Sequence, residues 1–546
     1  MAMNTLKRCS IFFLGMAIWF SGAGACFAAD DYWTNAVDGD FSVGANWTDG
    51  TAPGSADIAY FNKNAGSPYT VTFDVAITNS AFRVRTDRVA FNLNGLTNTA
   101  LSASIGTSSG DNGWLWLSNG TVHVTNIFNL GEVSGATGTL VVAAGGPVTI
   151  RPPAGISEWR NYVHVGRAGY GRLIVTNGGY LTIANKSLYI ASDTADGEGH
   201  VIVSGAGSVL QAYSPCVGYN ASEAAKTSTL EVLNGGVVGC SGNFNVYDQI
   251  IVDGPNSVLT SSSRCFLYGP GAGADVRVRN GGRFIFLSDQ FFLGGDKKGS
   301  FAVTDGGSAY LSCNGDGLWI GGFSTSQSGQ GGFMTIGTNS VVTHGSAAST
   351  VRIWTNSTVT LNDGTLQFGA TPIDLRGTVT GSGTIGSTST VVSINSTGLL
   401  VPGGTNSAGT LIVTNANLVF TNSLAGTTNG TLFLEFSESV HDMVILPNIN
   451  RSINLANAKL SYSLISGSSF RPRTPVFMDF LIATNITGAV FSDNMTSLLN
   501  AVTPSFVQYT YGIVTVGASD YGGLYSGYKA LRLTASMSAG TVVSFH

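Results

Sequence analysis

Residues 163–187 read VHVGRAGYGRLIVTNGGYLTIANKS, and residues 291–317 read FFLGGDKKGSFAVTDGGSAYLSCNGDG. Both are copies of one unit that recurs about every 25 to 29 residues between Val163 and Gly345, a period typical of solenoids. Each copy contains a short apolar opening strand, a Gly-rich bend, a second strand, a turn and a third strand. One unit cannot bury its own apolar face, so the units must stack on one another.

The turns and the alternation between them indicate how the stack forms. Asn177-Gly178-Gly179 and Asp305-Gly306-Gly307 place Gly where the chain bends through positive φ, a conformation that costs other residues energy. Between the turns, alternate side chains point inward and pack on the same position one coil away. The predicted fold class is all-β: a right-handed parallel β-helix (β-solenoid) with an N-terminal cap and a β-rich C-terminal cap or domain.

Composition supports strands and excludes several classes of protein. Only 10% of the 546 residues are charged, 73 are Gly, and 43% are hydrophobic. That hydrophobic content is enough to pack a core, which excludes a disordered chain. The net charge is −5 and the Lys and Arg residues are scattered, so the basic stripe of a nucleic-acid-binding protein is absent.

The N-terminus predicts export. Lys7 and Arg8 precede an apolar run over residues 11–20, and Cys26-Phe27-Ala28 provides a cleavage motif, as in a secretory signal peptide. The run is shorter than the roughly 20 apolar residues of a membrane span. A second interpretation is that Cys26 lies in a degenerate lipoprotein box and is acylated. No other segment is predicted to cross a membrane.

Changes in repeat pattern and composition divide the chain into four regions. We expect a signal peptide at 1–28, an N-terminal cap at 29–96, and a parallel β-solenoid at 97–446 whose clean repeats occupy 163–345. Residues 447–546 have a less regular repeat with longer loops and are expected to form a β-rich C-terminal cap or small domain. Trp33 and Trp47 favour the N-terminal cap, because aromatic side chains can cover the apolar end of a stack.

Cysteine spacing argues against disulfides. Cys216 and Cys265 fall in opening strands two units apart, whereas Cys240 and Cys313 lie in or just after third strands three units apart. Two units at about 4.8 Å each exceed the reach of a disulfide. The sequence therefore predicts four free thiols.

Two groups of charged residues are candidates for catalytic chemistry. Arg277, Arg279 and Arg283 share one coil, with Asp289 and Asp296 nearby, and their alternation predicts a solvated outer face. The group Glu435, His441 and Asp442 is likewise interpreted as surface.

Metal and cofactor motifs are also missing from the sequence. The histidines have no mutual spacing suited to a metal ion: His123, His164, His200, His344, His441 and His546. Asn314-Gly315-Asp316-Gly317 is a single turn rather than a calcium-binding repeat. We therefore predict no catalytic residue, no metal and no cofactor.

One row of residues departs from this background. The middle position of the opening strand is occupied in successive coils by His164, Tyr189, Cys216, Asn245, Phe266, Phe292 and Trp319. Phe266, Phe292 and Trp319 would stack as an aromatic column, which should point outward if the alternating Leu and Ile neighbours point inward. The column either has a structural role, lining the interior or stacking on the outside for stability, or forms a flat apolar strip that binds sugar rings or a partner protein.

The same repeats resemble a known family. The pattern VGxxGxGxLxVxNGG, from Val165-Gly166 to Gly178-Gly179, is similar to the type V secretion and PEP-CTERM-associated repeat. The block GTVTGSGTIGS and the following LLVPGGTNSAGTLIV resemble the autotransporter-associated β-strand segment. The resemblance implies a large exported protein of Gram-negative bacteria. The chain ends in SMSAGTVVSFH, so the family's sorting tail is not expected, and the hundred or so residues after Leu446 are too few for an autotransporter barrel.

These observations predict an exported β-solenoid without catalytic activity, located outside the cell or on its surface, that serves as a structural or adhesion module. Its expected partner is an extracellular glycan or another surface molecule. The alternatives are a carbohydrate-active β-helix enzyme, either lyase or hydrolase, and a glycan-binding module. An enzyme should present a charged cleft on consecutive coils.

Overall fold

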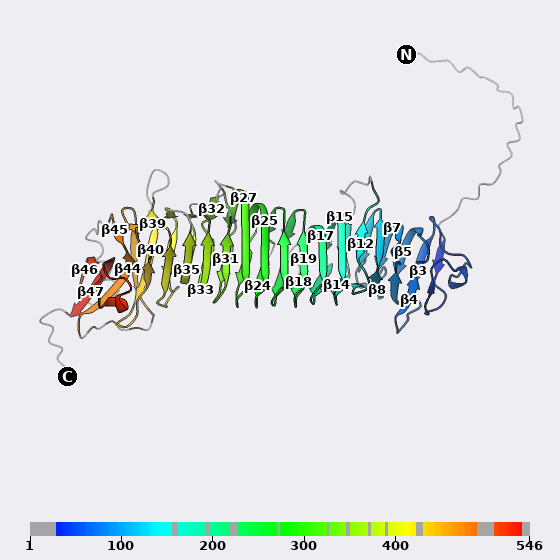
Figure 1. Ribbon diagram of the computed structural model, residues 1–546, viewed down its shortest axis with the longest axis horizontal. Coiled ribbons are helices and arrows are strands. Elements are labelled where there is room, and N and C mark those ends of the chain that lie inside the picture. The colour runs from blue at the N-terminus through cyan, green and yellow to red at the C-terminus, as the bar shows by residue number, and fades with distance from the viewer. Residues whose placement is uncertain are drawn as a thin grey trace, which may run out of the picture.

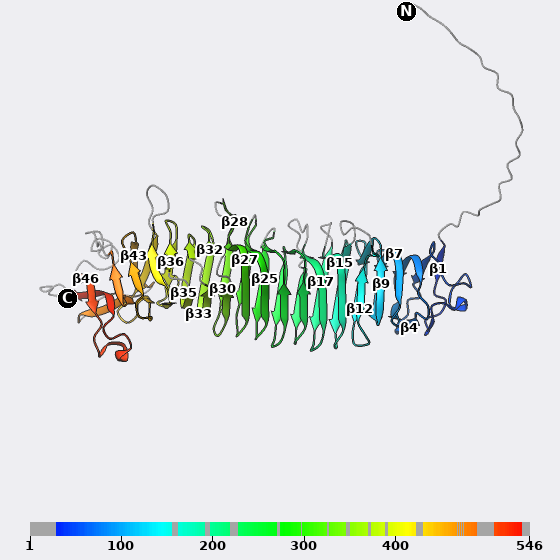
Figure 2. The ribbon, with the colours of Figure 1, turned by 45° about the horizontal axis from the view of Figure 1, so that its top comes forward.

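The chain forms a long rod of stacked coils (Figures 1 and 2). The structure is a computed structural model that describes residues 29–537, apart from 155–161, 192–196, 219–227, 270–272, 296, 325–326, 346–349, 370–372, 388–390, 422–429, 467, 469, 471, 473 and 489–506. The predicted signal peptide and Cys26 lie outside the described residues. Strands of successive coils lie side by side along the rod, from the N-terminal end to the C-terminal end.

Each coil contributes strands to three parallel ladders. The first ladder consists of opening strands, several of which are the second half of a longer strand that also ends the previous coil. In chain order its members are β1 (Asp30–Tyr32), β3 (Ile58–Phe61), β5 (Thr78–Val84), β7 (Thr97–Ile105), β10 (Ile127–Leu130), β13 (Tyr162–Val165), β15 (Tyr180–Ile190), β17 (Val209–Val217), β20 (Phe244–Val246), β23 (Cys265–Leu267), β25 (Arg283–Leu293), β27 (Ser308–Ile320), β32 (Thr350–Ile353), β34 (Ile373–Leu375), β36 (Val391–Ile394), β39 (Asn417–Phe420), β42 (Ser452–Asn454) and β45 (Asn485–Thr487).

The second ladder lies after the Gly-rich bend. Its members are β2 (Gly39–Asp40), β4 (Tyr69–Thr72), β6 (Arg88–Asn92), β8 (Asn112–Ser118), β11 (Thr137–Val142), β14 (Tyr170–Thr176), β16 (Glu198–Ser204), β18 (Thr229–Leu233), β21 (Gln249–Asp253), β24 (Ala274–Arg279), β26 (Gly299–Val303), β30 (Gly332–Ile336), β33 (Thr358–Phe368), β35 (Thr378–Ser387), β37 (Leu399–Pro402), β40 (Thr431–Phe436) and β43 (Lys459–Leu464).

The third ladder includes the first halves of β5, β7, β15, β17, β25 and β27 and the second halves of β33 and β35. Its other members are β9 (Gly120–Val124), β12 (Val148–Arg151), β19 (Val237–Cys240), β22 (Val258–Ser261), β31 (Val341–His344), β38 (Thr410–Thr414), β41 (Met443–Ile445) and β44 (Val476–Ala483). Outside the ladders lie the short hairpin β28 (Gly322–Ser324) and β29 (Gln327–Ser328) and the 3₁₀ turns η1 (Gly44–Asn46) and η3 (Asp520–Gly523).

The register of the ladders fixes which side chains face inward. Leu173 of β14 pairs with Val201 of β16, and Val201 pairs with Leu230 of β18, so the same inward position recurs from coil to coil. Such residues belong to one apolar core that extends from Trp33 to Ala535. The predicted parallel β-solenoid is confirmed, and the described residues contain strands and 3₁₀ turns but no α-helix.

Positive φ occurs where the turn sequences predict it. Asn177 and Gly178 have φ of 51° and 76°. The later Asn-Gly turns at 234–235 and 280–281 repeat this geometry. A second glycine position follows the opening strand: Gly166 has φ of 78°, and a Cβ there would lie 2.0 Å from the Glu198 carbonyl oxygen. The bend after the opening strand is therefore tight in both backbone angle and space.

The two ends of the rod are built differently. At the N-terminal end, Trp33 and Trp47 pack edge to face with ring centroids 5.1 Å apart, and both are buried. At the C-terminal end, β44 continues the third ladder in parallel, but β47 (Lys529–Met537) and β46 (Val507–Thr515) then pair antiparallel. An antiparallel hairpin thus ends the parallel sheet.

The four cysteines described by the structure are free and buried, as the spacing predicts. Burial raises the pKa of the Cys313 thiol to about 12. These thiols remain protonated at neutral pH, so they are poor nucleophiles and behave as small apolar side chains.

Candidate functional site

The strand register confirms the predicted row of opening-strand residues. Direct pairings connect His164 to Tyr189, Tyr189 to Cys216, Cys216 to Asn245, Asn245 to Phe266, Phe266 to Phe292, and Phe292 to Trp319. We call this row, continued by Arg352 and Asp374, the opening-strand column.

The aromatic side chains of the column point away from the core, as predicted. Their neighbours Leu267 and Leu293 are fully buried in the main core. Phe266 and Phe292 stack with ring centroids 5.1 Å apart and an angle of 4° between the rings. Phe292, Trp319 and Trp354 form a separate apolar cluster against which Phe266 packs.

The column does not present the flat exposed strip that the sequence allowed. Trp319 is 1% exposed and Phe292 is 5% exposed, whereas Phe266 is partly exposed. The Trp319 and Trp354 indole nitrogens are buried and find no hydrogen-bond acceptor among the described residues. A ligand could reach little of these rings without displacing what covers them; binding by Phe266, Phe292 and Trp319 stays a prediction.

An arginine ends the aromatic part of the column. The Arg352 guanidinium lies 5.4 Å from the Trp319 ring centroid and 5.0 Å from that of Trp354. Asp374 accepts a hydrogen bond from Arg352 Nε at 2.6 Å and also pairs with Arg376. The contacts favour a structural role, since the cation is held by two rings and a carboxylate.

Two buried basic residues lie in or next to the opening strands. His164 stacks on Tyr189 at 5.5 Å, and burial lowers the pKa of its imidazole to about 3, so the ring is neutral at pH 7. Lys186, at the corner that leads into the opening-strand half of β15, is fully buried and donates from Nζ to the Asn126 carbonyl at 3.0 Å. Burial lowers the pKa of Lys186 to about 8.

A second outward row was not singled out by the sequence. Trp114 and Trp116 of β8 alternate with Leu115 and Leu117, which are buried in the core, so both indoles lie on the outer side of the second ladder. Both are partly exposed, and their rings stack at 5.7 Å with an angle of 24°. The signal was present in GWLWLS, because two Trp two residues apart in a strand share one face.

The outward residues around these tryptophans form two rows, which we call the Trp face. Pairings between β6, β8, β11 and β14 place its residues in two parallel rows. One row is Arg88, Trp114, Thr139 and Arg172, and the other is Ala90, Trp116, Val141 and Ile174. Thr139 and Val141 are 1% and 7% exposed although they face outward, because large side chains surround them.

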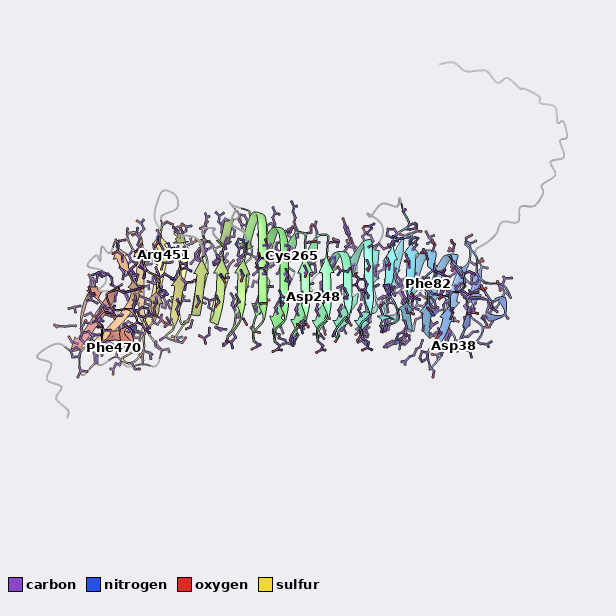
Figure 3. The ribbon with its side chains drawn as sticks, in the orientation of Figure 1. Asp38, Phe82, Asp248, Cys265, Arg451 and Phe470 are labelled. Carbon is purple, nitrogen blue, oxygen red and sulfur yellow. The ribbon has the colours of Figure 1, made fainter. Side chains whose placement is uncertain are left out.

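Polar groups follow the Trp face along the rod. His200 Nε2 lies 2.9 Å from Glu198 Oε1, and His200 Nδ1 lies 2.9 Å from Thr229 Oγ1, which in turn donates to Glu231 Oε1 at 3.3 Å. Asp248, near the middle of the rod (Figure 3), lies one coil further on, and burial raises the pKa of its carboxyl. Carboxylates and a histidine thus occupy consecutive coils.

The arginine cluster predicted to be a solvated face is partly ion-paired. Arg277 and Arg283 are exposed, as expected. Arg277 pairs with Asp275 at 2.6 Å, and Arg279 pairs with Asp253 at 2.8 Å. The Asp289 side chain and residue 296 lie outside the described part of the structure.

The surface interpretation of Glu435 and Asp442 is wrong. Glu435 is 1% exposed and Asp442 is fully buried. Asp442 Oδ2 accepts the Glu435 N–H at 2.7 Å, and its Oδ1 accepts the Gly409 N–H at 2.9 Å. Burial raises the pKa of Asp442 to about 7. The carboxyl bridges backbone groups of two coils, a long-range contact that the local sequence does not reveal.

Neither metal binding nor membrane crossing is seen in the described residues. No three His, Cys, Asp or Glu side chains there are grouped so as to hold a metal ion. In the same part of the chain, no helix has the length and apolar character needed to traverse a bilayer.

No protein-family model matches the chain, and no curated protein matches it. Among solved structures, the chain is similar to the TibC-catalyzed hyper-glycosylated TibA fragment, with 18% sequence identity and a TM-score of 0.29. The match covers 64% of this chain and 99% of that fragment. A superposition at this score supports no inference about the site, and the resemblance to the secretion-associated repeats stays a prediction.

Proposed function

We propose that this chain is an exported, non-catalytic rod that acts on the cell surface or outside the cell as a structural and adhesive module. The observation that carries the proposal is a single apolar core from Trp33 to Ala535 combined with outward aromatic residues on the Trp face. A solenoid of this kind extends as far as its coils continue, so it can hold a binding surface at a distance from its attachment point. The N-terminal export signal expected from the sequence supports the location.

The location is tested by expressing the full chain with a C-terminal epitope tag and fractionating the cells. We expect the tagged protein in the medium or in the surface fraction, where added protease removes it from intact cells. Recovery in the cytoplasmic fraction, with protection from protease until the cells are broken, would contradict the proposal. A cytoplasmic marker protein carrying the same tag controls for lysis.

The competing function is a carbohydrate-active enzyme. The chain of contacts from Glu198 through His200 and Thr229 to Glu231 favours this candidate, because glycan cleavage uses positioned carboxylates. Incubation with polysaccharides and measurement of new reducing ends or unsaturated products tests it. Turnover that disappears in both Glu198→Gln and Glu231→Gln would establish the enzyme and refute the non-catalytic proposal.

A further inference from the structure

Two arginines on the Trp face lack the acidic partners that Arg85 and Arg277 have. Arg85 is held by Asp111 at 2.9 Å, and Arg277 is held by Asp275 at 2.6 Å. Among the described residues, neither Arg88 nor Arg172 pairs with a carboxylate. Their positive charges are therefore not neutralised within the rod.

The register places these two charges on either side of a tryptophan. Arg88 pairs with Trp114, Trp114 with Thr139, and Thr139 with Arg172, so the arginines are three coils apart in one row. At about 4.8 Å a coil, their backbones are separated by about 14 Å. An elongated ligand with several negative charges could contact both.

The ring contacts leave an aromatic surface between the charges. The Arg88 guanidinium lies 5.3 Å from the Trp114 ring centroid, and Trp114 stacks on Trp116. Among the described residues, Trp116 makes no second ring or cation contact, and its side chain is partly exposed, so part of the indole is open to solvent. A pyranose ring presents a flat set of C–H groups that pack on the electron-rich face of an indole.

We propose that the Trp face binds an acidic glycan, with a sugar ring against Trp116 and carboxylate or sulfate groups paired with Arg88 and Arg172. This inference rests on the adhesive function proposed above and names its ligand class. The charges favour an acidic over a neutral chain, because an unpaired guanidinium forms strong, bidentate hydrogen bonds with oxyanions. The net charge of −5 and the scattered basic residues argue against nucleic acid.

Binding is measured by titrating the purified full-length protein with defined oligosaccharides and following tryptophan fluorescence and heat. The carboxylate probe is a hexamer of galacturonic acid, and its methyl ester is the neutral control with the same rings. Hexamers of mannuronic and guluronic acid and a heparin hexasaccharide complete the acidic panel, the last testing sulfate. We expect at least one acidic probe to bind and to weaken as salt increases.

Substitutions connect that binding to the Trp face. Trp116→Ala, and the double change Arg88→Gln with Arg172→Gln, should each weaken the affinity by about tenfold or more. The matched controls are Arg277→Gln, an exposed but ion-paired arginine, and Phe333→Ala, an exposed aromatic on β30 of the same ladder. Both controls should stay within about twofold of the unmodified chain.

Three results would overturn the inference: no binding of any acidic probe, equal binding of galacturonate and its methyl ester, or unchanged affinity in the Trp116 and Arg88/Arg172 variants. Circular dichroism of each variant verifies that the strands persist, so that unfolding of a variant is not misread as a loss of its binding site. Binding by purified protein does not depend on cellular location. Failure of the glycan titration would therefore refute the ligand proposal without affecting the surface location. A cytoplasmic location would refute the surface proposal without affecting the measured binding.

Discussion

The opening-strand column and the Trp face are both outward rows of a parallel stack, but they differ in what solvent can reach. In the column, Phe292 and Trp319 are almost wholly buried, whereas Trp114 and Trp116 on the Trp face are partly exposed. Strand alternation determines only the side of the sheet on which a residue lies. Exposure depends on neighbours in other coils, so two similar sequence signals lead to different roles.

Side-chain size in the next coil accounts for part of the difference. Within the column, Phe292 is followed by Trp319 and then by Arg352, so each large group is covered by another. On the Trp face, Trp114 and Trp116 are followed by the smaller Thr139 and Val141, which are covered while the indoles stay partly open. The first arrangement favours stability and the second leaves a surface for a ligand.

The largest expected contrast comes from removing one tryptophan from each row. Trp319→Ala should destabilise the coils around it by about 3–5 kcal/mol, because a buried aromatic leaves a cavity. Trp116→Ala should cost about 1 kcal/mol or less, as expected for a partly exposed side chain. Hydrogen exchange of β27 and β32, compared with that of β8 and β11, measures each local effect without assuming two-state unfolding. Equal losses in the two variants would remove the distinction between the rows.

The pH dependence of stability tests the burial of Lys186, which lies next to the opening-strand column. Lys186 has a pKa near 8 when folded and an ordinary value of 10.5, so between these values the unfolded chain binds the extra proton. Stability should rise with pH across this window, by about 3 kcal/mol in all, and this gain is lost again as pH falls from 10.5 to 8. Lys186→Met should lack this rise. The test is the difference between the two melting profiles from pH 7 to 10.5, and identical slopes would show that the amine is hydrated.

A smaller effect is expected where the column meets Arg352. Arg352→Lys keeps the positive charge but loses the planar contact with Trp319 and Trp354 and the hydrogen bond from Nε to Asp374. We expect a loss of about 1–2 kcal/mol, measured by hydrogen exchange of β32 and β34. Arg277→Lys, which changes an exposed arginine on the second ladder, serves as the control and should cost less than about 0.5 kcal/mol. A loss in the control as large as in Arg352→Lys would argue against the aromatic contacts.

The period of the repeat was sufficient to predict the fold and the register of the opening-strand column. Asn-Gly turns and alternating strands define where each coil begins, so His164 could be aligned with Trp319 across the intervening coils. The Trp face was also visible in GWLWLS, but the unpaired state of Arg88 and Arg172 depends on which carboxylates lie in adjacent coils. That information requires the packed structure.

Burial of polar groups was the least predictable feature. Asp442 is buried because it accepts N–H groups from Gly409 and Glu435, and Gly409 is 33 residues away. Lys186 is buried because its amine contacts the Asn126 carbonyl, 60 residues away. Charged residues in strands usually indicate solvent, so local patterns favoured the surface for Glu435 and Asp442.

Hydroxyl-radical footprinting, resolved to single residues by mass spectrometry, tests the difference between the two rows most directly. Trp116 and Trp319 share the same indole chemistry, so their oxidation rates in one sample compare solvent access alone. We predict rapid oxidation of Trp116 and strong protection of Trp319, with Trp116 becoming protected when an acidic glycan is bound. Equal oxidation of both tryptophans in the free protein would contradict the account.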